Sequence, residues 1–494
     1  MFHRTRALSL ALLVSSGLVA AALAPTAGAS APGDTGADRS AAGQARLAGG
    51  WKAVSSGAVD VLSEITVART PDGVLHAVYQ QDVGTVAEYE HASISTSGSV
   101  LSRSKPVGTW GTLIHNPKLL RSTTGGLRLV FSGLQDTNSA NFYSRGYAYD
   151  TISDAAGTTW TLQPRALTKF GYAYSGYGVG ATTLSNGTPV TAASLNSETH
   201  YRVGTIDTTD HIAVTNAPPD GVSSVGLGNY TFHTQLVNSG DAVWMLTYVL
   251  GNSEASEGIF AQQIHPTVGA VLKAPGSTTG GSSLNPDQTI AAVARPGGGV
   301  VVAYKTGYPT TNAISVWQVG GSTKKIKAKN VYQIAMDTGA SGRLWLAWVD
   351  GSDQVRAVRS APNGLAFGAV QKLGRPTSSA DLWRIAVDAS LDQGTVLVND
   401  TVARRVSLRM VKPGLSLSAS GSLRAHRLGS VKVKVTDAGD ALKGVKVKGG
   451  GDSCKTKANG KCTLTVTPKK SGKLAFVATR GGYGAGKDTI KVKR

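Results

Sequence analysis

The chain has 494 residues, 61 of them glycine, and carries a formal net charge of +20. This length fits two or three domains of ordinary size, or one large repeat fold followed by a small domain. The many Gly, Thr, Ser and Val residues, together with few helix formers, argue against a helical fold and predict an all-β chain. The charge is uneven, since residues 413–494 hold 18 Lys or Arg and 4 Asp, a balance of +14.

The first 29 residues have the features of a secretory signal peptide. Arg4 and Arg6 precede an apolar stretch over residues 7–23, and a run of small residues ends at Ala29. The apolar stretch is too short and too rich in alanine for a membrane span, and no later stretch approaches about 20 apolar residues. We therefore expect a secreted, extracellular bacterial protein that is cleaved after Ala29 and has no membrane span.

Units of strand, glycine turn and strand recur from residue 51 to residue 412. In one of them, Gly342 separates the apolar runs 332–337 and 344–349. By subtraction, successive turn glycines lie 44 to 61 residues apart; they are Gly73, Gly126, Gly187, Gly240, Gly298, Gly342 and Gly394. Internal repeats of roughly 40–50 residues that each hold short strands are typical of a β-propeller.

Each repeat contains four predicted strands, the inner ones apolar and the outer one more polar. First strands are predicted at 65–68, 118–120, 289–293 and 385–387, second strands at 74–79, 127–131, 243–248, 300–304 and 395–398, and third strands at 143–149, 354–359 and 406–410.

The last repeat lacks a fourth strand before Pro413. Residues 30–50 have no periodicity and are predicted to be a flexible leader, and an isolated strand follows at 51–54. This strand can pair near Val406 and close the ring, which would remove exposed sheet edges. The predicted fold is a seven-bladed β-propeller over residues 51–412, with six blades and one irregular insertion as the alternative.

Residues 413–494 alternate between apolar and polar side chains, as in Val431–Val435 and Thr489–Val492. About 80 residues with several such strands predict a small immunoglobulin-like β-sandwich with one lysine-bearing face. The runs 435–439, 458–461 and 481–483 resemble bacterial immunoglobulin-like surface modules.

Two cysteines, Cys454 and Cys462, lie on either side of an Asn459-Gly460 turn signal. In an exported chain such a pair predicts a disulfide across the two strands of a hairpin. A metal pair is the alternative, but no His or further Cys is nearby.

The segment Ser153–Trp160 resembles the Asp-box turn of the sialidase superfamily. Ser153, Gly157, Thr159 and Trp160 match its Ser-x-Asp-x-Gly-x-Thr-Trp pattern, while the acidic residue is shifted by one position to Asp154. A weaker copy occupies residues 360–367. The resemblance implies a sialidase-like propeller, in which a glycine allows the tight turn and an aromatic ring packs under it.

The sialidase superfamily clamps a carboxylate with three arginines and adds a Tyr–Glu pair and an acid. No set of three arginines can be assigned from their spacing in the sequence. Arg384 lies near the start of the predicted first strand of the last repeat. Catalysis is therefore left open, with Glu64, Glu198, Asp287 and Arg384 as candidates.

In a propeller the loops between blades, and those between second and third strands, open on one face. Aromatic rings and polar groups on that face could bind a sugar by stacking and hydrogen bonding. The predicted ligand-binding residues are Tyr172, Tyr174, Tyr177, His115, His233 and Trp383. Packing over the channel is the alternative for the three tyrosines, and a structural role is the alternative for the two histidines.

The leading hypothesis is a secreted glycan-binding propeller whose basic carboxyl-terminal domain attaches to anionic surface polymers. A glycoside hydrolase or polysaccharide lyase is the first alternative, and a protein-binding structural propeller is the second. Few aromatic residues lie among the lysines, which argues against nucleic acid. No cofactor is predicted; Asp350 and Asp353 could ligate calcium, but a simple turn explains them as well.

Overall fold

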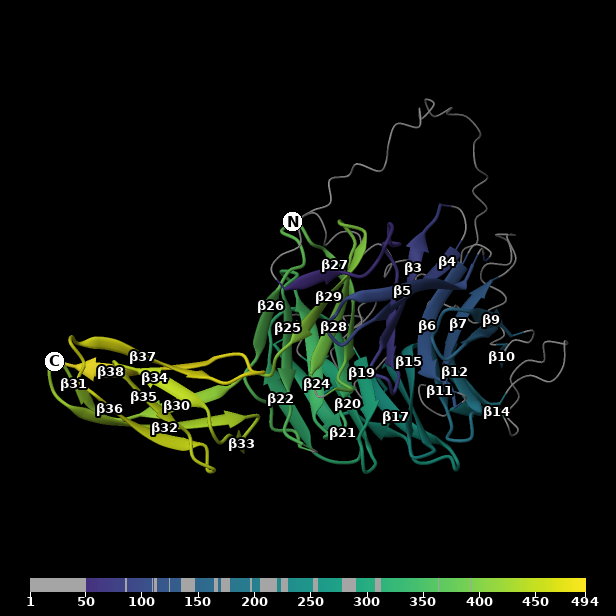
Figure 1. The fold of residues 1–494 in the computed structure, drawn as a ribbon. Helices are drawn as coiled ribbons and strands as arrows, with labels where there is room; N and C mark the ends of the chain where they lie inside the picture. The colour runs from purple at the N-terminus through teal and green to yellow at the C-terminus, as the bar shows by residue number, and fades with distance from the viewer. Residues whose placement is uncertain are drawn as a thin grey trace, which may run out of the picture.

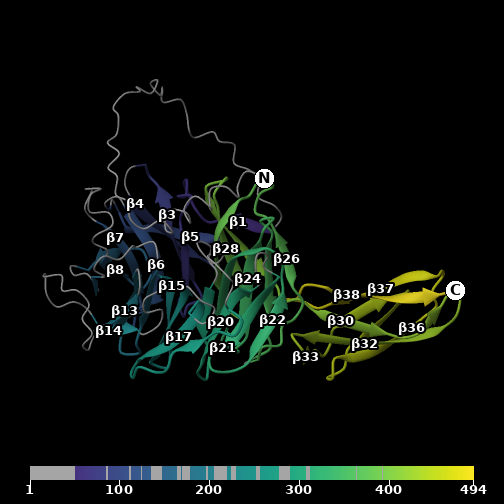
Figure 2. The same cartoon turned by 180° about the vertical axis from the view of Figure 1, so that it is seen from behind.

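The computed structural model describes residues 50–84, 87–108, 110, 113–123, 125–134, 147–163, 168–169, 178–195, 198–204, 220–223, 230–251, 256–277, 290–306, 312–362, 364–391 and 393–494. All regular elements among them are strands, so the prediction of an all-β chain is confirmed. In the same residues no helix could cross a membrane. Figures 1 and 2 show a large assembly built by residues 50–411, from which residues 414–494 project as an elongated arm.

Six antiparallel sheets of the large assembly follow the chain in order. They are β2 (Ile65–Arg69), β3 (Leu75–Asp82), β4 (Ala87–Ile94) and β5 (Val100–Val107); β6 (Leu113–Arg121), β7 (Leu127–Leu134), β8 (Tyr147–Ser153), β9 (Trp160–Leu162) and β10 (Thr168–Lys169); β11 (Val179–Thr183), β12 (Pro189–Leu195), β13 (Glu198–Val203) and β14 (Asp220–Ser223); β15 (Tyr230–Ser239), β16 (Ala242–Leu250), β17 (Gly258–His265) and β18 (Leu272–Lys273); β19 (Ile290–Ala294), β20 (Val300–Thr306), β21 (Ala313–Gln318) and β22 (Thr323–Lys327); and β23 (Val331–Thr338), β24 (Leu344–Asp350), β25 (Val355–Arg359) and β26 (Gln371–Gly374).

The seventh sheet joins the two ends of the large assembly. It holds β27 (Leu382–Asp388), β28 (Gly394–Asp400), β29 (Arg405–Val411) and, as its fourth strand, β1 (Trp51–Ala53). First strands of neighbouring sheets contact one another in the order β2, β6, β11, β15, β19, β23 and β27, and β27 contacts β2 again. Antiparallel sheets whose first strands form a closed ring are a β-propeller, so the predicted propeller fold is confirmed.

Burial along the strands follows from their place in the ring. Every residue of β20, β24 and β28 is buried, because these second strands have a neighbouring sheet on both faces. The fourth strand β22 exposes four of its five residues and buries only Ile326. Trp345 and Trp348 on β24 are each 1% exposed and belong to the hydrophobic core.

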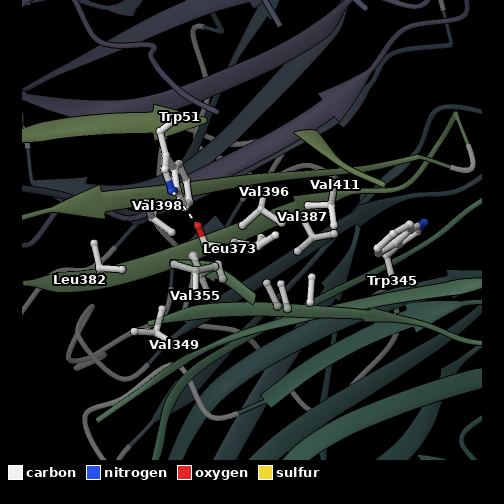
Figure 3. Packing of buried hydrophobic residues seen from close by; sticks show 14 of the residues in the cluster. Trp51, Trp345, Val349, Val355, Leu373, Leu382, Val387, Val396, Val398 and Val411 are labelled. Carbon is white, nitrogen blue, oxygen red and sulfur yellow. Dashed lines mark hydrogen bonds between the residues drawn. The ribbon is translucent and has the colours of Figure 1, made fainter. Parts of the chain in front are cut away.

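Trp51 holds the closing strand in place. It lies opposite Arg409 in antiparallel register, and Val54 donates its backbone N–H to the Val406 carbonyl at 2.9 Å. The Trp51 indole is 5% exposed and donates from Nε1 to the Leu373 carbonyl at 3.3 Å. Figure 3 shows this ring among the valine and leucine side chains that β24 to β29 contribute. The predicted pairing of residues 51–54 with the strand at Val406 is confirmed.

Five of the seven predicted turn glycines have positive φ angles, among them Gly73 at +87° and Gly342 at +72°. Gly126 and Gly394 do not. A Cβ atom on Gly126 would lie 2.3 Å from the Ser153 carbonyl oxygen, and one on Gly394 would lie 2.9 Å from the Trp345 ring. These two glycines are therefore required by close packing rather than by turn geometry.

The arm consists of two sheets packed face to face. One holds β30 (Ser416–Ser420), β32 (Gly429–Asp437), β33 (Asp440–Ala441) and β36 (Lys461–Val466); the other holds β31 (Leu423–Arg424), β38 (Gly486–Lys493), β37 (Gly472–Thr479), β34 (Lys446–Gly449) and β35 (Asp452–Lys455). Their inward side chains, including Val433 and Phe476, make a core composed only of arm residues.

The predicted disulfide between Cys454 and Cys462 is present, with the two Cα atoms 6.1 Å apart. Its expected setting was wrong, because the two cysteines do not lie on paired strands of one hairpin. Cys454 belongs to β35 and Cys462 to β36, and these strands belong to different sheets. The disulfide therefore links the two layers of the arm, while Gly460, at φ +73°, makes the turn between them.

An ion cluster, buried at Asp437 but exposed at Asp440, joins the arm to the propeller. Arg343 donates from Nη2 to Asp440 Oδ2 at 2.5 Å, and Arg359 donates to Asp437 Oδ2. The Asp437 side chain is 3% exposed. The Arg359 guanidinium also lies 5.9 Å from the Tyr483 ring of the arm. Charges buried this deeply require their partners, so the cluster fixes where the arm leaves the ring.

The closing strand generates a stability prediction. Trp51→Ala should lower the free energy of unfolding by about 3–5 kcal/mol, because it removes a buried indole and opens a cavity in the seventh sheet. Lys52→Ala, at the exposed neighbouring position, should change it by less than about 1 kcal/mol. Thermal or denaturant unfolding measures both. Equal effects of the two substitutions would contradict the role of Trp51.

Candidate functional site

One end of the ring, called here the loop mouth, is where the first strands begin. Four first strands carry a β-bulge close to this end, in β6, β15, β23 and β27. A bulge inserts an extra residue, bends the strand and redirects a side chain, and bulges are frequent beside functional sites. The repetition of this irregularity at one level of the ring marks the loop mouth as the candidate site.

The bulges place polar and aromatic residues at this level. They include Asn116 in β6, His233 in β15, Tyr332 in β23 and Trp383 in β27. Asn116 and His233 have φ angles of +52° and +56°, which are uncommon for residues other than glycine. Tyr332 is 39% exposed, although it lies in a strand that is otherwise mostly buried.

Three predicted candidates come together at the loop mouth. Glu64 immediately precedes β2, Arg384 lies on β27 and His115 on β6, and these three strands are neighbours in the ring. Arg384 Nε lies 3.9 Å from Glu64 Oε1, a loose ion pair. Burial lowers the pKa of the His115 imidazole, and the charges of Glu64 and Asp60 only partly oppose this. His115 is thus a neutral ring beside a carboxylate.

The backbone before Glu64 is fixed by the last sheet. Asn399 Nδ2 donates to the Asp60 carbonyl at 3.2 Å and to the Ser63 carbonyl at 3.1 Å. Ser63 Oγ accepts the backbone N–H of Gln80 at 2.8 Å. These bonds hold the segment that carries Glu64 to both β28 and β3, so the carboxylate projects from a rigid support.

Three buried polar atoms around this cluster have no hydrogen-bond partner within the part of the chain that the structure describes. They are Glu64 Oε2, the Tyr89 hydroxyl and Trp383 Nε1. Burial raises the pKa of the Tyr89 phenol well above its usual range, and the charge of Glu64 raises it further. The neutral Tyr89 and Trp383 groups are donors and the Glu64 oxygen is an acceptor. The described residues thus leave two donors and one acceptor of this region unsatisfied.

Arg384 also orients the Trp383 ring. Its guanidinium carbon lies 4.3 Å from the centre of the indole, a cation–π contact. This covers one face of the ring, so that a ligand could stack only on the other.

Glu90 shows what a structural carboxylate looks like in the same sheet. Its Oε1 accepts from the Tyr79 hydroxyl at 2.5 Å and lies 3.2 Å from Arg103 Nε, and its Oε2 accepts from Ser56 Oγ at 2.8 Å. Glu90 is 4% exposed, and both of its oxygens are used. Glu64, by contrast, keeps one oxygen unused within the described residues.

The remaining candidates are placed only in part or not at all. Glu198 begins β13, where it lies opposite Leu195 in register, and its side chain is outside the described residues. His233 lies in the β15 bulge, three first strands along the ring from β2. The other candidates, Asp287, Tyr172, Tyr174 and Tyr177, lie outside the described residues.

Tyr89 and Tyr332 were not among the residues predicted for the site. Tyr89 lies on a third strand whose eight residues are all buried, so nothing in the alternation separates it from core residues. Tyr332 could have been suspected, because a large polar ring begins an otherwise apolar strand. Neither bulge geometry nor ring neighbours can be predicted from spacing.

Asp350 and Asp353, considered above as calcium ligands, serve a turn. Asp350 Oδ1 accepts the backbone N–H of Ser352 at 3.0 Å, and Arg356 Nη2 lies 2.9 Å from Asp350 Oδ2. Asp353 Oδ1 accepts the backbone N–H of Leu382 at 3.1 Å. Among the described residues no group of three or more His, Cys, Asp or Glu side chains could hold a metal ion.

The opposite end of the ring, called here the turn mouth, holds the tight turns between first and second strands. Arg69 and Asp388, at the ends of β2 and β27, form a buried ion pair of 2.7 Å. Burial raises the pKa of Asp337, at the corresponding place on β23, to about 6. An open cavity of about 640 Å³ lies beside Thr338, Gly240 and Gly298.

The two Asp-box-like segments share one hydrogen-bond pattern. Ser153 Oγ accepts the N–H of Leu127 and donates to the Asp154 carbonyl. Ser360 Oγ likewise accepts the N–H of Leu344 and donates to the Ala361 carbonyl. Each serine thus ties the end of a third strand to the start of a second strand.

In the segment Ser153–Trp160, the side chain of Asp154 accepts the hydrogen bonds of the turn. Hydrogen bonds from the Thr158 hydroxyl and backbone N–H lower the pKa of Asp154 to about 2, although its burial opposes this. Trp160 Nε1 donates to Ser104 Oγ at 2.9 Å. The turn therefore joins its own sheet to the first sheet and has no part in the loop mouth.

No family model matches the chain. No curated protein matches it either. Among solved structures, an α-L-arabinanase of Penicillium chrysogenum complexed with arabinobiose is 14% identical, with a TM-score of 0.45 over 65% of this chain and 98% of that one. A thermostable family-43 glycoside hydrolase is 9% identical, with a TM-score of 0.31 over 56% and 99%. The endosialidase of phage phi92 is 8% identical, with a TM-score of 0.23 over 90% and 69%. Since these scores lie below 0.5, neither a family nor an activity follows from them.

The different roles of Glu64 and Glu90 can be tested by measuring the free energy of unfolding of their variants. Glu64→Gln should change the free energy of unfolding by no more than about 0.5 kcal/mol, because it removes one loose ion pair. Glu90→Gln should lower it by about 1–3 kcal/mol, because buried donors lose a charged acceptor. Thermal unfolding of both variants at pH 7 measures the difference. A large loss for Glu64→Gln would show that this carboxylate is structural.

The raised pKa of Asp337 predicts a pH effect. The unfolded carboxyl titrates near 3.8 and the folded one near 6, so its contribution to stability is present below about pH 4 and is lost as the pH rises through 6. Asp337→Asn keeps the oxygen that accepts the Ala389 N–H and abolishes this loss. Relative to the parent chain, the variant should gain on the order of 2–3 kcal/mol between pH 4 and pH 8. A stability difference that stays constant over this range would contradict the prediction.

Proposed function

We propose that the chain is a secreted glycan-binding protein that recognises sugar at the loop mouth of a seven-bladed, sialidase-like propeller. The observation that carries the proposal is the group of buried polar atoms formed by Glu64 Oε2, the Tyr89 hydroxyl and Trp383 Nε1, none of which has a partner among the described residues. Buried polar atoms are nearly always hydrogen-bonded in proteins. A sugar hydroxyl both donates and accepts, so it suits this mixture of donors and an acceptor.

The surroundings of these atoms support a sugar rather than a charged ligand. Among the described residues, the ion partner of Glu64 is the distant Arg384, at 3.9 Å, and His115 is kept neutral by burial. The aromatic residues Trp383 and Tyr332, on neighbouring bulged strands, can stack on the apolar face of a sugar ring. This arrangement gives hydrogen bonding and stacking with little net charge.

A blade count of seven, rather than six, is part of the proposal. It is supported by seven sheets and seven mutually contacting first strands among the described residues. The Ser153 and Ser360 turns support the sialidase-like assignment. In the proposed division, residues 1–29 are the signal peptide, 30–50 the leader, 51–412 the propeller and 413–494 a basic immunoglobulin-like domain. This last domain attaches the protein to an anionic surface polymer.

A glycoside hydrolase is the second candidate, favoured by one observation. The charge of Glu64 acts on the neutral side chains of His115 and Tyr89. A carboxylate beside neutral groups of this kind suits proton transfer. Hydrolysis by two carboxylates needs a second acid at a defined separation, which Asp287 or Glu198 would have to supply. Binding is preferred because it requires only the groups described at the loop mouth.

Glycan binding by single-site variants tests the proposal. Trp383→Ala and Glu64→Gln should each weaken retention on a glycan array, or affinity for the best neutral oligosaccharide, by about tenfold, which corresponds to roughly 1.4 kcal/mol. Two control substitutions lie away from the loop mouth: Trp160→Ala replaces another tryptophan, and Asp72→Asn replaces another acid, in the turn between β2 and β3. Each should change affinity by less than about twofold. Folding of each variant is verified by its melting temperature.

Two results would contradict the proposal. The absence of retention on any glycan at low salt would remove the binding function. Turnover of chromogenic glycosides by the parent chain that Glu64→Gln abolishes would instead establish the hydrolase.

A further inference from the structure

The outer face of the five-stranded sheet in the arm is covered by cations. Strands β34, β37 and β38 alternate between buried apolar and exposed residues, so that every second side chain lies on this face. The exposed cations of the sheet are Arg424, Lys446, Lys448, Lys455, Lys473, Lys487, Lys491 and Lys493.

No carboxylate of these five strands belongs to that face. Asp452 alternates with the exposed Ser453 and Lys455, and its Oδ2 accepts the Thr465 N–H of the other sheet at 2.8 Å. Asp488 lies opposite the buried Phe476, and its Oδ2 accepts the Ala419 N–H of the other sheet at 2.7 Å. Both aspartates bind backbone groups of the opposing layer, so neither neutralises the lysines.

The strand register places like charges directly opposite one another. Lys446 on β34 lies opposite Lys455 on β35, and Lys473 on β37 lies opposite Lys491 on β38. Directly opposed like charges destabilise an antiparallel sheet. Two such pairs on one face raise the free energy of the folded state, and a bound anion would reduce this repulsion.

The geometry of the face fits an extended polyanion. Lysines two positions apart along a strand are separated by about 6.7 Å, and neighbouring strands lie about 4.8 Å apart. Several regularly spaced positive charges can therefore contact successive negative charges of one linear chain. On the five strands themselves no large apolar side chain is exposed; Leu428, which is exposed, lies in the loop after β31. A single such residue does not make the apolar face that insertion into a lipid surface requires.

Most of the cations on this face are lysines. Seven of the eight exposed cations are lysines, whose ammonium groups act as compact point charges and are known phosphate binders in proteins. Planar, bidentate binding of carboxylate or phosphate groups favours arginine instead, so this face suits single charges spaced along a chain. The face also presents no aromatic ring on which a nucleic-acid base could stack. Phe476 is completely buried, and Tyr483 lies near Arg359 at the junction with the propeller.

We propose that this face binds a linear phosphodiester polymer of the teichoic acid kind, with one phosphate per repeat. The inference rests on the proposed attachment of the arm to an anionic surface, and it names the binding face and the chemistry of the polymer. The interaction is electrostatic, so each lysine that contacts a phosphate adds to the salt dependence of binding.

The arm supplies a matched control for the test. Lys434 on β32 lies opposite Lys461 on β36, so the other sheet carries one Lys–Lys pair on its own outer face. The variants K473Q/K491Q and K434Q/K461Q thus remove the same charge and the same kind of pair from opposite faces of the arm. Either change relieves repulsion, so neither should lower the melting temperature of the full chain.

Binding is measured with the mature full-length chain and immobilised poly(glycerol phosphate) at low salt. K473Q/K491Q should weaken affinity at least threefold, and adding K446Q/K455Q should bring the loss to tenfold or more with a shallower salt dependence. K434Q/K461Q should change affinity by less than twofold. Polygalacturonate, duplex DNA and phosphatidylglycerol vesicles at equal anion concentration should each bind more weakly than the phosphodiester polymer.

Equal losses in the two paired variants would overturn the proposed face. Equal or tighter binding of polygalacturonate, DNA or vesicles would overturn the proposed polymer. Trp383→Ala separates this inference from the sugar site, because it should leave binding of poly(glycerol phosphate) unchanged. If neutral glycans fail to bind while the lysine variants behave as expected, the propeller proposal fails and the polymer site stands.

Discussion

The pairing of β1 with β29 is the constraint on which the other features depend. It joins residues 51–53 to residues 407–409 in one antiparallel sheet, so that the seventh sheet gains its fourth strand from the opposite end of the chain. The contact between β27 and β2 is a consequence. Without this pairing the last sheet would end at β29, whose outer edge would be unpaired.

Ring closure also assembles the candidate site. Glu64 comes from the first sheet and Arg384 from the last, yet they lie 3.9 Å apart because closure makes β2 and β27 neighbours. The buried Arg69–Asp388 ion pair links the same two strands at the turn mouth. The loop mouth and the turn mouth are therefore stabilised at one seam, where the chain ends meet. The Glu64–Arg384 pair can therefore form only when the ring is closed.

Much of the fold could be predicted from the sequence, and much of the site could not. Apolar runs on either side of turn glycines are local features, and they predicted the positions of first and second strands. The isolated strand at Trp51 indicated how the propeller ring closes. The site depends on non-local features. The bulge at Trp383 is defined only by its pairing partner, and Tyr89 approaches Glu64 from a different strand. The prediction that Cys454 and Cys462 lie on paired strands of one hairpin was wrong for the same reason, since spacing does not show which sheet a strand joins.

The arm and the loop mouth are related through the sixth sheet. Arg343 and Arg359, which bind Asp440 and Asp437 of the arm, border the second and third strands of the sheet whose first strand carries Tyr332. Because Asp437 is buried with both guanidiniums, separation of the arm would break two ion pairs that are shielded from water. The junction is therefore stiff rather than a free linker. In the proposed function, a polymer bound to the lysine face would therefore hold the loop mouth in a fixed orientation relative to the surface.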